Sequence, residues 1–371
     1  MGDVILFDWV IPGVKSLMVL MLVLHLSAFC LWIERKGSAI IQNRVGANRA
    51  SIFGVMSFNL GFVNTLVADP LKLFTKEEFV PAGADKFIHG IAPFLALFPA
   101  VITMVAVPFG DSIEIAGRVV ELQAVRLDVG VLFVSATMSM GVYGVALAGW
   151  SSNNRWALLG SIRGSAQMIS YELAMGISLV SMILFYGTLD MQAMVRAQGG
   201  LFLGFLPDWG IFYQPVACLI IFVAGIAESK RVPFDLPECE SELISGYYTE
   251  YSGGKQASFM LADFAESVMV AGLVTTMFFG GWQVPYLSKE GFALPGMSPI
   301  ALPAIAITLA QMGIFTLKLV FFCWLQILIR WTIPRFRYDQ LMRLGWKGMM
   351  PIALANMVIT ALAILLLEKP A

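Results

Sequence analysis

The chain has 371 residues, of which 58% are hydrophobic and only 13% are charged, and its mean hydropathy is +0.79. Soluble domains carry about 25% charged residues, so this composition excludes an ordinary soluble protein and predicts an all-α integral membrane protein. The formal net charge of −1 gives no indication of nucleic-acid binding.

Redox cofactors are not indicated by the residue types of this chain. The four cysteines are widely spaced without a CxxC pair, and the two histidines are His25 and His89. We therefore expect no iron–sulfur cluster, haem or other metal site here. Neither a GxGxxG fingerprint nor a Walker motif occurs, so flavin or nucleotide chemistry would belong to a partner.

Eight stretches are long and apolar enough to cross a bilayer, for which about 20 residues are needed. They are residues 10–33, 87–109, 129–150, 164–186, 211–229, 261–284, 300–329 and 347–367. We predict a single polytopic membrane domain, 1–371, with eight transmembrane helices. The stretch 300–329 is long enough to tilt or to project beyond the bilayer.

Lysine and arginine are distributed unevenly among the connections. The loops after the first, third, fifth and seventh stretches hold 17 of the 24 basic residues. Because cytoplasmic loops of membrane proteins are enriched in lysine and arginine, these four loops are predicted to be cytoplasmic. Both termini then lie on the periplasmic side.

The first of these connections, 34–86, is the longest. Apolar residues recur at helical spacing from Ile52 to Val63, too interrupted for a span. We predict a helix over 51–73 that lies at or dips into the membrane interface. A plain surface helix and a functional lining are both open for it.

The predicted cytoplasmic loop 228–260 is unusually acidic. Pro233 and Pro237 oppose a regular helix between them. A helix that starts near Pro237 would place Glu238 and Glu242 on one face. The acidic residues of the loop are Glu228, Asp235, Glu238, Glu240, Glu242 and Glu250. A solvated acidic loop is one interpretation, and groups that take and release protons are the other.

Several ionisable residues fall within predicted spans, where a charge costs at least about 2.5–3.5 kcal/mol. Glu172 lies nine residues after Arg163, about 13 Å along its helix. Asp263 and Glu266 are three residues apart and share a helix face. Lys318 is near the middle of the seventh span, and it and Asp263 could equally be structural hydrogen-bonding groups. A row from the acidic loop through Glu228, Glu266 and Glu172 would form a proton path.

The last cytoplasmic loop, IRWTIPRFRYDQLMRLGWK, alternates arginines with Trp331, Phe336, Tyr338 and Trp346. Aromatic belts at membrane interfaces account for such a pattern. A docking surface for a soluble partner or an amphipathic ligand would show it too, because arginine and aromatic residues are favoured there.

Five motifs stand in order along the chain and together resemble one protein family closely. That family is the membrane subunit of respiratory complex I (proton-translocating NADH:quinone oxidoreductase), called subunit 1 in mitochondria and the H subunit in bacteria. The resemblance covers almost the whole chain, and AE-x₃-PFDLPE-x-ESEL and PRFRYDQLM are highly specific. The motifs are IERKGSAIIQNRVGAN, ADPLKLFTKE, RGSAQMISYELA, AESKRVPFDLPECESELISGYYTEYSG and IRWTIPRFRYDQLM.

The resemblance implies a place in the bacterial inner membrane, at the junction with the peripheral arm. There the family forms, with peripheral-arm subunits, the chamber through which ubiquinone or menaquinone reaches an iron–sulfur cluster. Small and antiporter-like membrane subunits are the other expected partners, besides membrane lipid, and this chain itself would hold no redox centre. By motif match, chamber or junction residues are Arg35, Asp69, Phe234, Arg330, Arg335 and Arg337. The acidic path that couples quinone chemistry to proton translocation would comprise Glu172, Glu228, Asp235, Glu238, Glu240, Glu242, Glu250 and Glu266.

This sequence departs from the family pattern at three positions. Ala47 stands where a proline is usual, and Cys239 where an alanine is common. Asp263 stands where an aromatic or apolar residue is common, so the resemblance leaves its role open.

Two other functions compete with the quinone enzyme. Related subunits anchor membrane-bound hydrogenases and formate hydrogenlyases, in which a similar acidic path would work without quinone. The motifs ERK, ADPLK and PRFRYDQLM, on the chamber side, favour the quinone enzyme over such an anchor. An independent transporter is the third class, but we find no internal repeat of the kind that such transporters often show.

Overall fold

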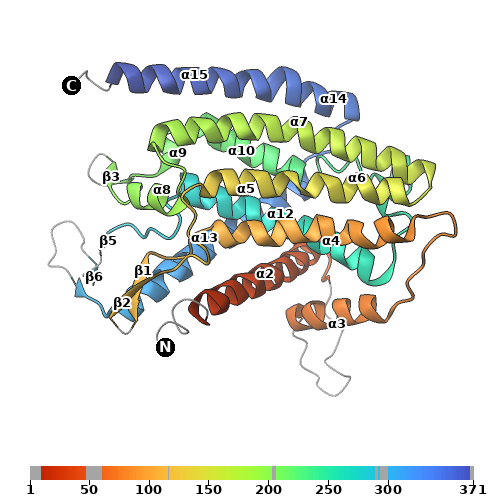
Figure 1. The fold of residues 1–371 in the computed structure, drawn as a ribbon, viewed down its shortest axis with the longest axis horizontal. Helices are drawn as coiled ribbons and strands as arrows, with labels where there is room; N and C mark the ends of the chain where they lie inside the picture. Colours follow the sequence, from red (N-terminus) through yellow and green to blue (C-terminus); the bar gives the residue numbers. More distant parts are fainter. Residues whose placement is uncertain are drawn as a thin grey trace.

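The computed structural model describes residues 10–46, 61–115, 117–202, 206–288, 291–292 and 300–367. Long helices run roughly side by side along the longest axis, and short strand pairs lie at one end of them (Figure 1). The all-helical character that the composition predicts is therefore confirmed for the long elements.

The helices follow one another through the whole described chain. They are α2 (Ile11–Ile41), α3 (Gly61–Thr75), α4 (Lys86–Ile102) with a 3₁₀ turn (Thr103–Ala106), α5 (Gly130–Ser139), α6 (Gly141–Ser151), α7 (Arg155–Tyr186), α8 (Met191–Ala197), α9 (Gly210–Tyr213), α10 (Pro215–Glu228), α11 (Glu240–Leu243) with a 3₁₀ turn (Gly246–Tyr248), α12 (Gly253–Phe278), α13 (Ala304–Thr332), α14 (Tyr338–Arg343), a π-helical turn (Leu344–Met349) and α15 (Met350–Leu367).

The strands are short and pair only locally. β1 (Ser112–Ile115) pairs antiparallel with β2 (Arg118–Glu121), and Ser112 faces Glu121. The remaining strands are β3 (Leu201–Phe202) with β4 (Leu206–Pro207), and β5 (Leu287–Ser288), β6 (Gly291–Phe292) and β7 (Ile300–Ala301) in that order.

Seven helical stretches of the described chain are long and apolar enough to cross a membrane. The predicted span 211–229 is different, because it is divided into α9 and α10. Gln214 between them leaves the helical conformation (φ −129°, ψ 55°), as expected of a residue before proline. α10 itself has 14 residues, so seven of the eight predicted spans correspond to helices long and apolar enough to cross a membrane.

Some helices extend beyond the apolar stretches that predicted them. α2 runs to Ile41, although the predicted span ends at 33, and α14 begins at Tyr338, although the predicted span begins at 347. Hydropathy marks where a helix leaves the lipid, whereas the backbone hydrogen bonds continue through charged residues. Of the predicted helix 51–73, residues 51–60 lie outside the described residues, and α3 covers the rest.

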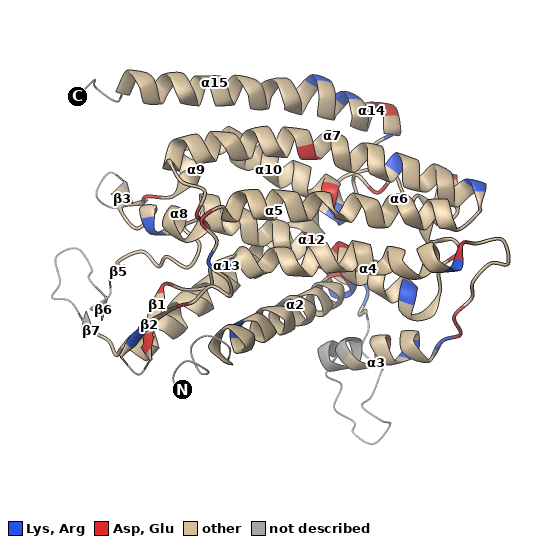
Figure 2. Ribbon diagram, viewed as in Figure 1, with Lys and Arg blue, Asp and Glu red and all other residues tan. Residues whose placement is uncertain are grey.

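The first and last described helices, α2 and α15, begin and end at the same end of the bundle (Figure 1). The connections at the opposite end carry many of the basic residues, around α3, the start of α4 and α14 (Figure 2). An even number of passes along the bundle would produce this arrangement.

α12 is the central helix of the bundle. It contacts α2, α4, α10 and α13, and every residue from Ala262 to Phe278 is buried. A helix that is covered all round must bury whatever it carries. Asp263 and Glu266, the eleventh and fourteenth residues of α12, must therefore have partners inside the protein.

Lys318 of α13 has a structural role at the other end of α12. Its Nζ donates hydrogen bonds to the backbone oxygens of Phe279, Gly281 and Gln283 at 2.8, 3.0 and 2.9 Å. The ammonium also lies 4.9 Å from the ring centroid of Trp209. A cation is favourable at the C-terminal end of a helix, so Lys318 fits the structural alternative.

Two glycines bring α7 against the acidic loop. A Cβ on Gly160 would lie 2.7 Å from Gly246 Cα and 2.9 Å from the oxygen of Pro237. Gly246 itself has φ +54°, a left-handed conformation that favours glycine. Neither position has room for a side chain, so this contact fixes the loop on α7.

We expect Gly160→Ala to destabilise the protein by about 1–3 kcal/mol, because the methyl group overpacks the contact. Gly176→Ala, in the same helix, is the matched control, since a Cβ there meets nothing within 4 Å. Alanine should make that helix more stable by about 0.5–1 kcal/mol. Thermal unfolding of the detergent-solubilised variants measures both. Equal midpoints for the two variants would contradict this packing.

Candidate functional site

The chain between α10 and α12 forms the candidate site. It is irregular from Ser229 to Cys239, as Pro233 and Pro237 predict. The prediction of a helix that starts near Pro237 is wrong, because α11 begins only at Glu240. Glu238 and Glu242 therefore do not share a helix face, since Glu238 precedes the helix.

A buried ammonium group links this loop to α12. Lys230 Nζ lies 3.0 Å from Asp263 Oδ1 and 2.9 Å from Glu266 Oε2, and the Lys230 side chain is 2% exposed. Tyr248 donates a hydrogen bond to the other oxygen of Asp263. Burial by itself lowers the pKa of Lys230, but the two carboxylates raise it above its ordinary value. The group therefore remains a cation, and the expected shared face of Asp263 and Glu266 is confirmed.

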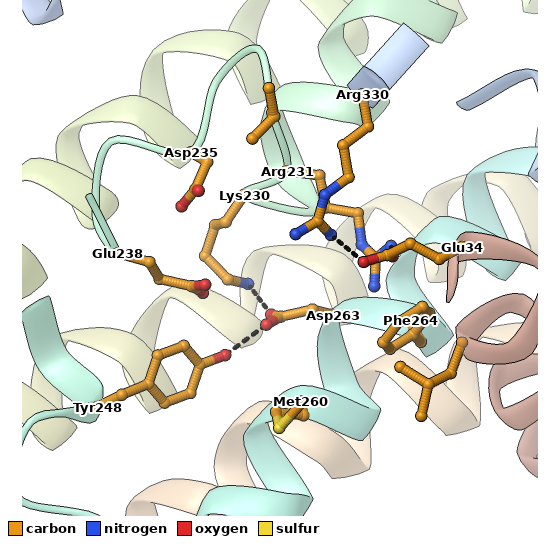
Figure 3. A pocket seen from close by; sticks show the side chains of 12 residues that line it. Glu34, Lys230, Arg231, Asp235, Glu238, Tyr248, Met260, Asp263, Phe264 and Arg330 are labelled. Atoms are coloured by element: carbon orange, nitrogen blue, oxygen red, sulfur yellow. Dashed lines mark hydrogen bonds and ion pairs between the residues drawn. The ribbon is translucent and has the colours of Figure 1, made fainter. Parts of the chain in front are cut away.

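A second ion cluster joins three elements next to the first. Glu34 of α2 forms two ion pairs. One carboxylate oxygen lies 2.9 Å from Arg231 Nη1, and the other lies 3.0 Å from Arg330 Nη1. The Arg231 guanidinium also lies 3.6 Å from the ring centroid of Phe264. One carboxylate thus holds α2, the loop and α13 together, as Figure 3 shows.

Asp235 forms a third ion pair. Its Oδ2 lies 2.8 Å from Arg335 Nη2, and Arg335 Nη1 contacts Cys239 Sγ at 2.9 Å. Burial raises the pKa of Asp235 to about 6, although Arg335 and Arg330 oppose the shift. Its charge state therefore changes close to neutral pH.

A charged cavity of about 120 Å³ lies among these groups. Glu238 points into it beside Lys230 (Figure 3), and Tyr247 donates a hydrogen bond of 3.1 Å to Glu238 Oε1. Burial raises the pKa of Glu238 well above its ordinary value, and the carboxylates of Asp263 and Asp235 add to this. The charged groups that line the cavity are Glu34, Lys230, Arg231, Asp235, Glu238, Asp263 and Arg330.

Two further carboxyl groups, Glu228 and Glu172, lie in the bundle near Glu266. Glu228, at the end of α10, is 1% exposed, and neither of its carboxyl oxygens has a hydrogen-bond partner. Glu172 of α7 accepts a hydrogen bond from Ser139. A Cβ on Gly141 would lie 3.4 Å from Glu266 Oε1. The break between α5 and α6 therefore lies between Glu172 and Glu266.

Other predicted path residues lie at the edge of this arrangement. Glu242 pairs with Arg163 at 2.7 Å and is 47% exposed. Glu250 accepts a hydrogen bond of 2.7 Å from Asn154, in the turn before α7. Glu240 belongs to α11, but its side chain lies outside what the structure describes. The structure therefore places Glu238 beside Lys230 (Figure 3), which pairs with Glu266, and directs Glu242 and Glu250 to other partners.

Only some of the predicted chamber residues belong to the ion clusters. Arg330 and Arg335 belong to the ion clusters, whereas Arg337 is 73% exposed and pairs with Asp339 at 3.3 Å. Arg35 lies on α2, not in a loop, and its 2.7 Å ion pair with Asp69 attaches α3.

Phe234 points into the protein interior. Its ring stacks on Phe336 with 5.5 Å between centroids and lies 5.5 Å from Tyr171. Phe234 is 4% exposed. It holds the loop against α7 and the segment before α14.

Sequence reasoning did not single out Glu34, Lys230, Arg231 or Tyr248. A usable signal was present, because Lys230 and Arg231 follow a span directly while the next span begins with two buried acids. Two cations placed there predict ion pairs to that helix. Within the described ranges, no group of histidine, cysteine and acidic side chains is arranged to hold a metal ion.

Comparison with known proteins gives consistent matches over nearly the full length. The NADH dehydrogenase family model matches residues 14–361. NADH-quinone oxidoreductase H subunit 2 of Geobacter sulfurreducens is 43% identical over 353 positions, which cover 95% of this chain and 96% of that protein. The NADH-quinone oxidoreductase H subunit of Bdellovibrio bacteriovorus is 39% identical over 382 positions, 97% of each chain. H subunit 1 of Geobacter metallireducens is 42% identical, covering 97% and 98%.

The Asp235 carboxyl group should lose its proton with a midpoint near pH 6, and its ion pair with Arg335 should be complete only above that pH. Infrared titration of the wild type against Asp235→Asn isolates its carboxylic acid band. Arg335→Gln removes the cation that opposes the effect of burial, so the midpoint should move to higher pH. A wild-type midpoint near 3.8, the ordinary value, or a downward shift in Arg335→Gln would contradict this environment.

Proposed function

The chain belongs to the H subunit family of NADH-quinone oxidoreductase, respiratory complex I, and we propose that it forms part of the quinone chamber and carries the acidic path that couples quinone reduction to proton translocation. It is a multi-pass subunit of an oxidoreductase of the bacterial inner membrane. The observation that carries the proposal is the charged cavity, because Lys230 connects its wall to the buried acids of α12.

In this proposal the chain crosses the membrane eight times, and α9 and α10 together form the eighth crossing. Both termini face the periplasm, in agreement with the basic residues at the opposite end of the bundle (Figure 2). α3 lies at the cytoplasmic interface. Its exposed apolar residues Val67, Leu71 and Phe74 recur at helical spacing, as in helices that rest on a bilayer surface.

The chamber function rests on the arginines at the same end. Arg330 and Arg335 present guanidinium groups near the cavity, and guanidinium donors suit the carbonyl oxygens of a quinone head group. The cavity itself is lined mainly by charged groups, which do not fit an isoprenoid tail. We therefore place it beside the chamber, whose apolar walls would come from α3, α2 and the partner subunits.

Other residues of the predicted chamber take supporting roles in this proposal. Arg35 and Asp69 fix α3 as one wall. Arg337, which is largely exposed, would contact peripheral-arm subunits. Phe234 would support the loop from behind, because its ring is buried against Tyr171 and Phe336. Ubiquinone or menaquinone is the proposed substrate.

The proposed acidic path begins at the cavity and runs into the bundle. Reduction of a quinone to a quinol consumes protons, and developing negative charge near Asp235 and Glu238 makes nearby carboxylates better proton acceptors. From Glu238 the path would continue through Glu266 and Glu228 to Glu172. Glu240, Glu242 and Glu250 would lie at its cytoplasmic mouth. Antiporter-like and small membrane subunits would receive the effect beyond Glu172.

A membrane anchor of a hydrogenase or formate hydrogenlyase is not proposed, because the relatives reported above carry the name of the quinone oxidoreductase. The partners can be identified directly. We expect a tag on this chain, used after solubilisation in mild detergent, to copurify flavin-containing and iron–sulfur subunits with inhibitor-sensitive NADH:quinone reductase activity. Copurified hydrogenase subunits without that activity would contradict the assignment.

Glu172→Gln tests the acidic path. Glutamine keeps a hydrogen-bond acceptor for Ser139 but cannot take up a proton, so the assembled enzyme should still reduce quinone while moving several-fold fewer protons per electron. Proton uptake by proteoliposomes, measured together with NADH oxidation, gives this ratio. Glu77→Gln, an exposed residue outside the path, is the control. An unchanged ratio in Glu172→Gln would remove Glu172 from the path.

A further inference from the structure

Lys230 lies between the charged cavity and the buried acids of α12. Among the described residues it is the cation that both lines the cavity and pairs with Glu266. Its ammonium bridges Asp263 and Glu266 on α12, and Glu238 points toward it from the loop (Figure 3). An ammonium group has three donors, of which two are directed at the α12 carboxylates. The third is available for Glu238.

We propose that Lys230 is a mobile positioning cation, which exchanges between Glu266 and Glu238 while Asp263 holds it, and so links proton occupancy of the loop to that of the membrane helix. The inference deepens the proposed acidic path and rests on it. It assigns roles to Lys230 and Asp263, which the resemblance to the family leaves without one.

Asp263 is the fixed point of the exchange. Its Oδ1 accepts Lys230 at 3.0 Å, and its Oδ2 is occupied by the hydroxyl of Tyr248. An unpaired buried ammonium would be strongly unfavourable. Because Asp263 stays bound, Lys230 keeps one carboxylate in both positions and never lies unpaired.

The exchange conserves charge within the cluster. In one arrangement Glu238 carries a proton, Glu266 is ionised, and the ammonium contacts Glu266. In the other, the proton has left Glu238, a proton has been taken up by Glu266, and the ammonium has moved to Glu238. With Asp263 ionised throughout, Lys230 and the three carboxyl groups carry a net charge of −1 in both.

The geometry permits such a movement. The lysine side chain is flexible, and the cavity of about 120 Å³ lies directly beside it. The high proton affinity of Glu238 agrees with the first arrangement, because burial raises its pKa. Glu228, buried and without a hydrogen-bond partner, lies within electrostatic range of Glu266 and can take the next proton.

Other charged groups surround the cluster but are paired elsewhere. Arg231 and Arg330 are bound to Glu34, and Asp235 is bound to Arg335. Tyr247 and Tyr248 face the cluster from the 3₁₀ turn before α12. Lys230 is therefore the cation that contacts both Asp263 and Glu266 among the described residues.

The double variant Lys230→Gln/Asp263→Asn tests the inference in the assembled complex. It neutralises cation and anchor together and keeps hydrogen-bonding groups at both positions, so the enzyme should assemble and reduce quinone. Without the cation, the proton-to-electron ratio should fall several-fold, by as much as we expect for Glu172→Gln. The matched control is Lys255→Gln/Glu78→Gln, which neutralises an ion pair at the same end of the bundle; its ratio should equal that of the wild type.

A spectroscopic readout separates a mobile cation from a structural ion pair. In wild type, quinone reduction should change a carboxylic acid infrared band that is absent in Glu266→Gln, and the double variant should lose this change. A double variant with wild-type ratio and band would overturn the role of Lys230 and leave the proposed function intact. An unchanged Glu172→Gln beside an altered double variant would instead overturn the longer path and leave Lys230 in its role.

Discussion

The burial of the Lys230 ammonium between Asp263 and Glu266 is the interaction on which the site depends. Charges removed from water must be paired and hydrogen-bonded, and α12 is buried at every residue from Ala262 to Phe278. The loop after α10 therefore has to fold back onto the N-terminal half of α12 to supply a cation. Glu34 adds α2 and α13 to the same assembly through Arg231 and Arg330, so the conformation of the loop follows largely from charge neutralisation.

α7 gives this charged loop its rigid support. Its Gly160 lets the loop backbone approach closely, and Gln167 donates hydrogen bonds to the backbone oxygens of Ala227 and Phe234 at 2.7 and 2.9 Å. The same helix carries Glu172 about one turn further along. Close packing thus fixes the backbone around the cavity, while the carboxyl groups that can change their charge remain on side chains with hydrogen-bonding alternatives. A rigid frame with titratable side chains suits proton transfer better than a loop that moves as a whole.

Hydropathy and helical spacing predict most of the bundle and the shared face of Asp263 and Glu266, because both depend on local sequence. They fail where a charge ends an apolar stretch without ending the helix, as at Glu34 in α2. The site is less predictable, since its pairs join residues such as Lys230 and Glu266, 36 positions apart, across an irregular loop. The motif resemblance names most acids of the site, but it does not show that Glu242 turns away to Arg163 or which cation neutralises the buried carboxylates.

The division between α9 and α10 has a consequence for the lipid around the protein. A helix of 14 residues extends about 21 Å, whereas the hydrocarbon layer is about 30 Å thick. At its start, Gln214 forms hydrogen bonds of 2.7 and 2.9 Å with Thr360 and Asn356 of α15. These bonds fix the position of α10 along its axis, so the difference between its length and the hydrocarbon thickness stays at one end. In the proposed topology of eight crossings, α9 and neighbouring protein would have to cover the remaining thickness, or the bilayer would have to thin locally. In that topology the acyl-chain length of the lipid would set how much of the shortfall remains, whereas Glu228, at the far end of α10 and 1% exposed, stays enclosed by protein.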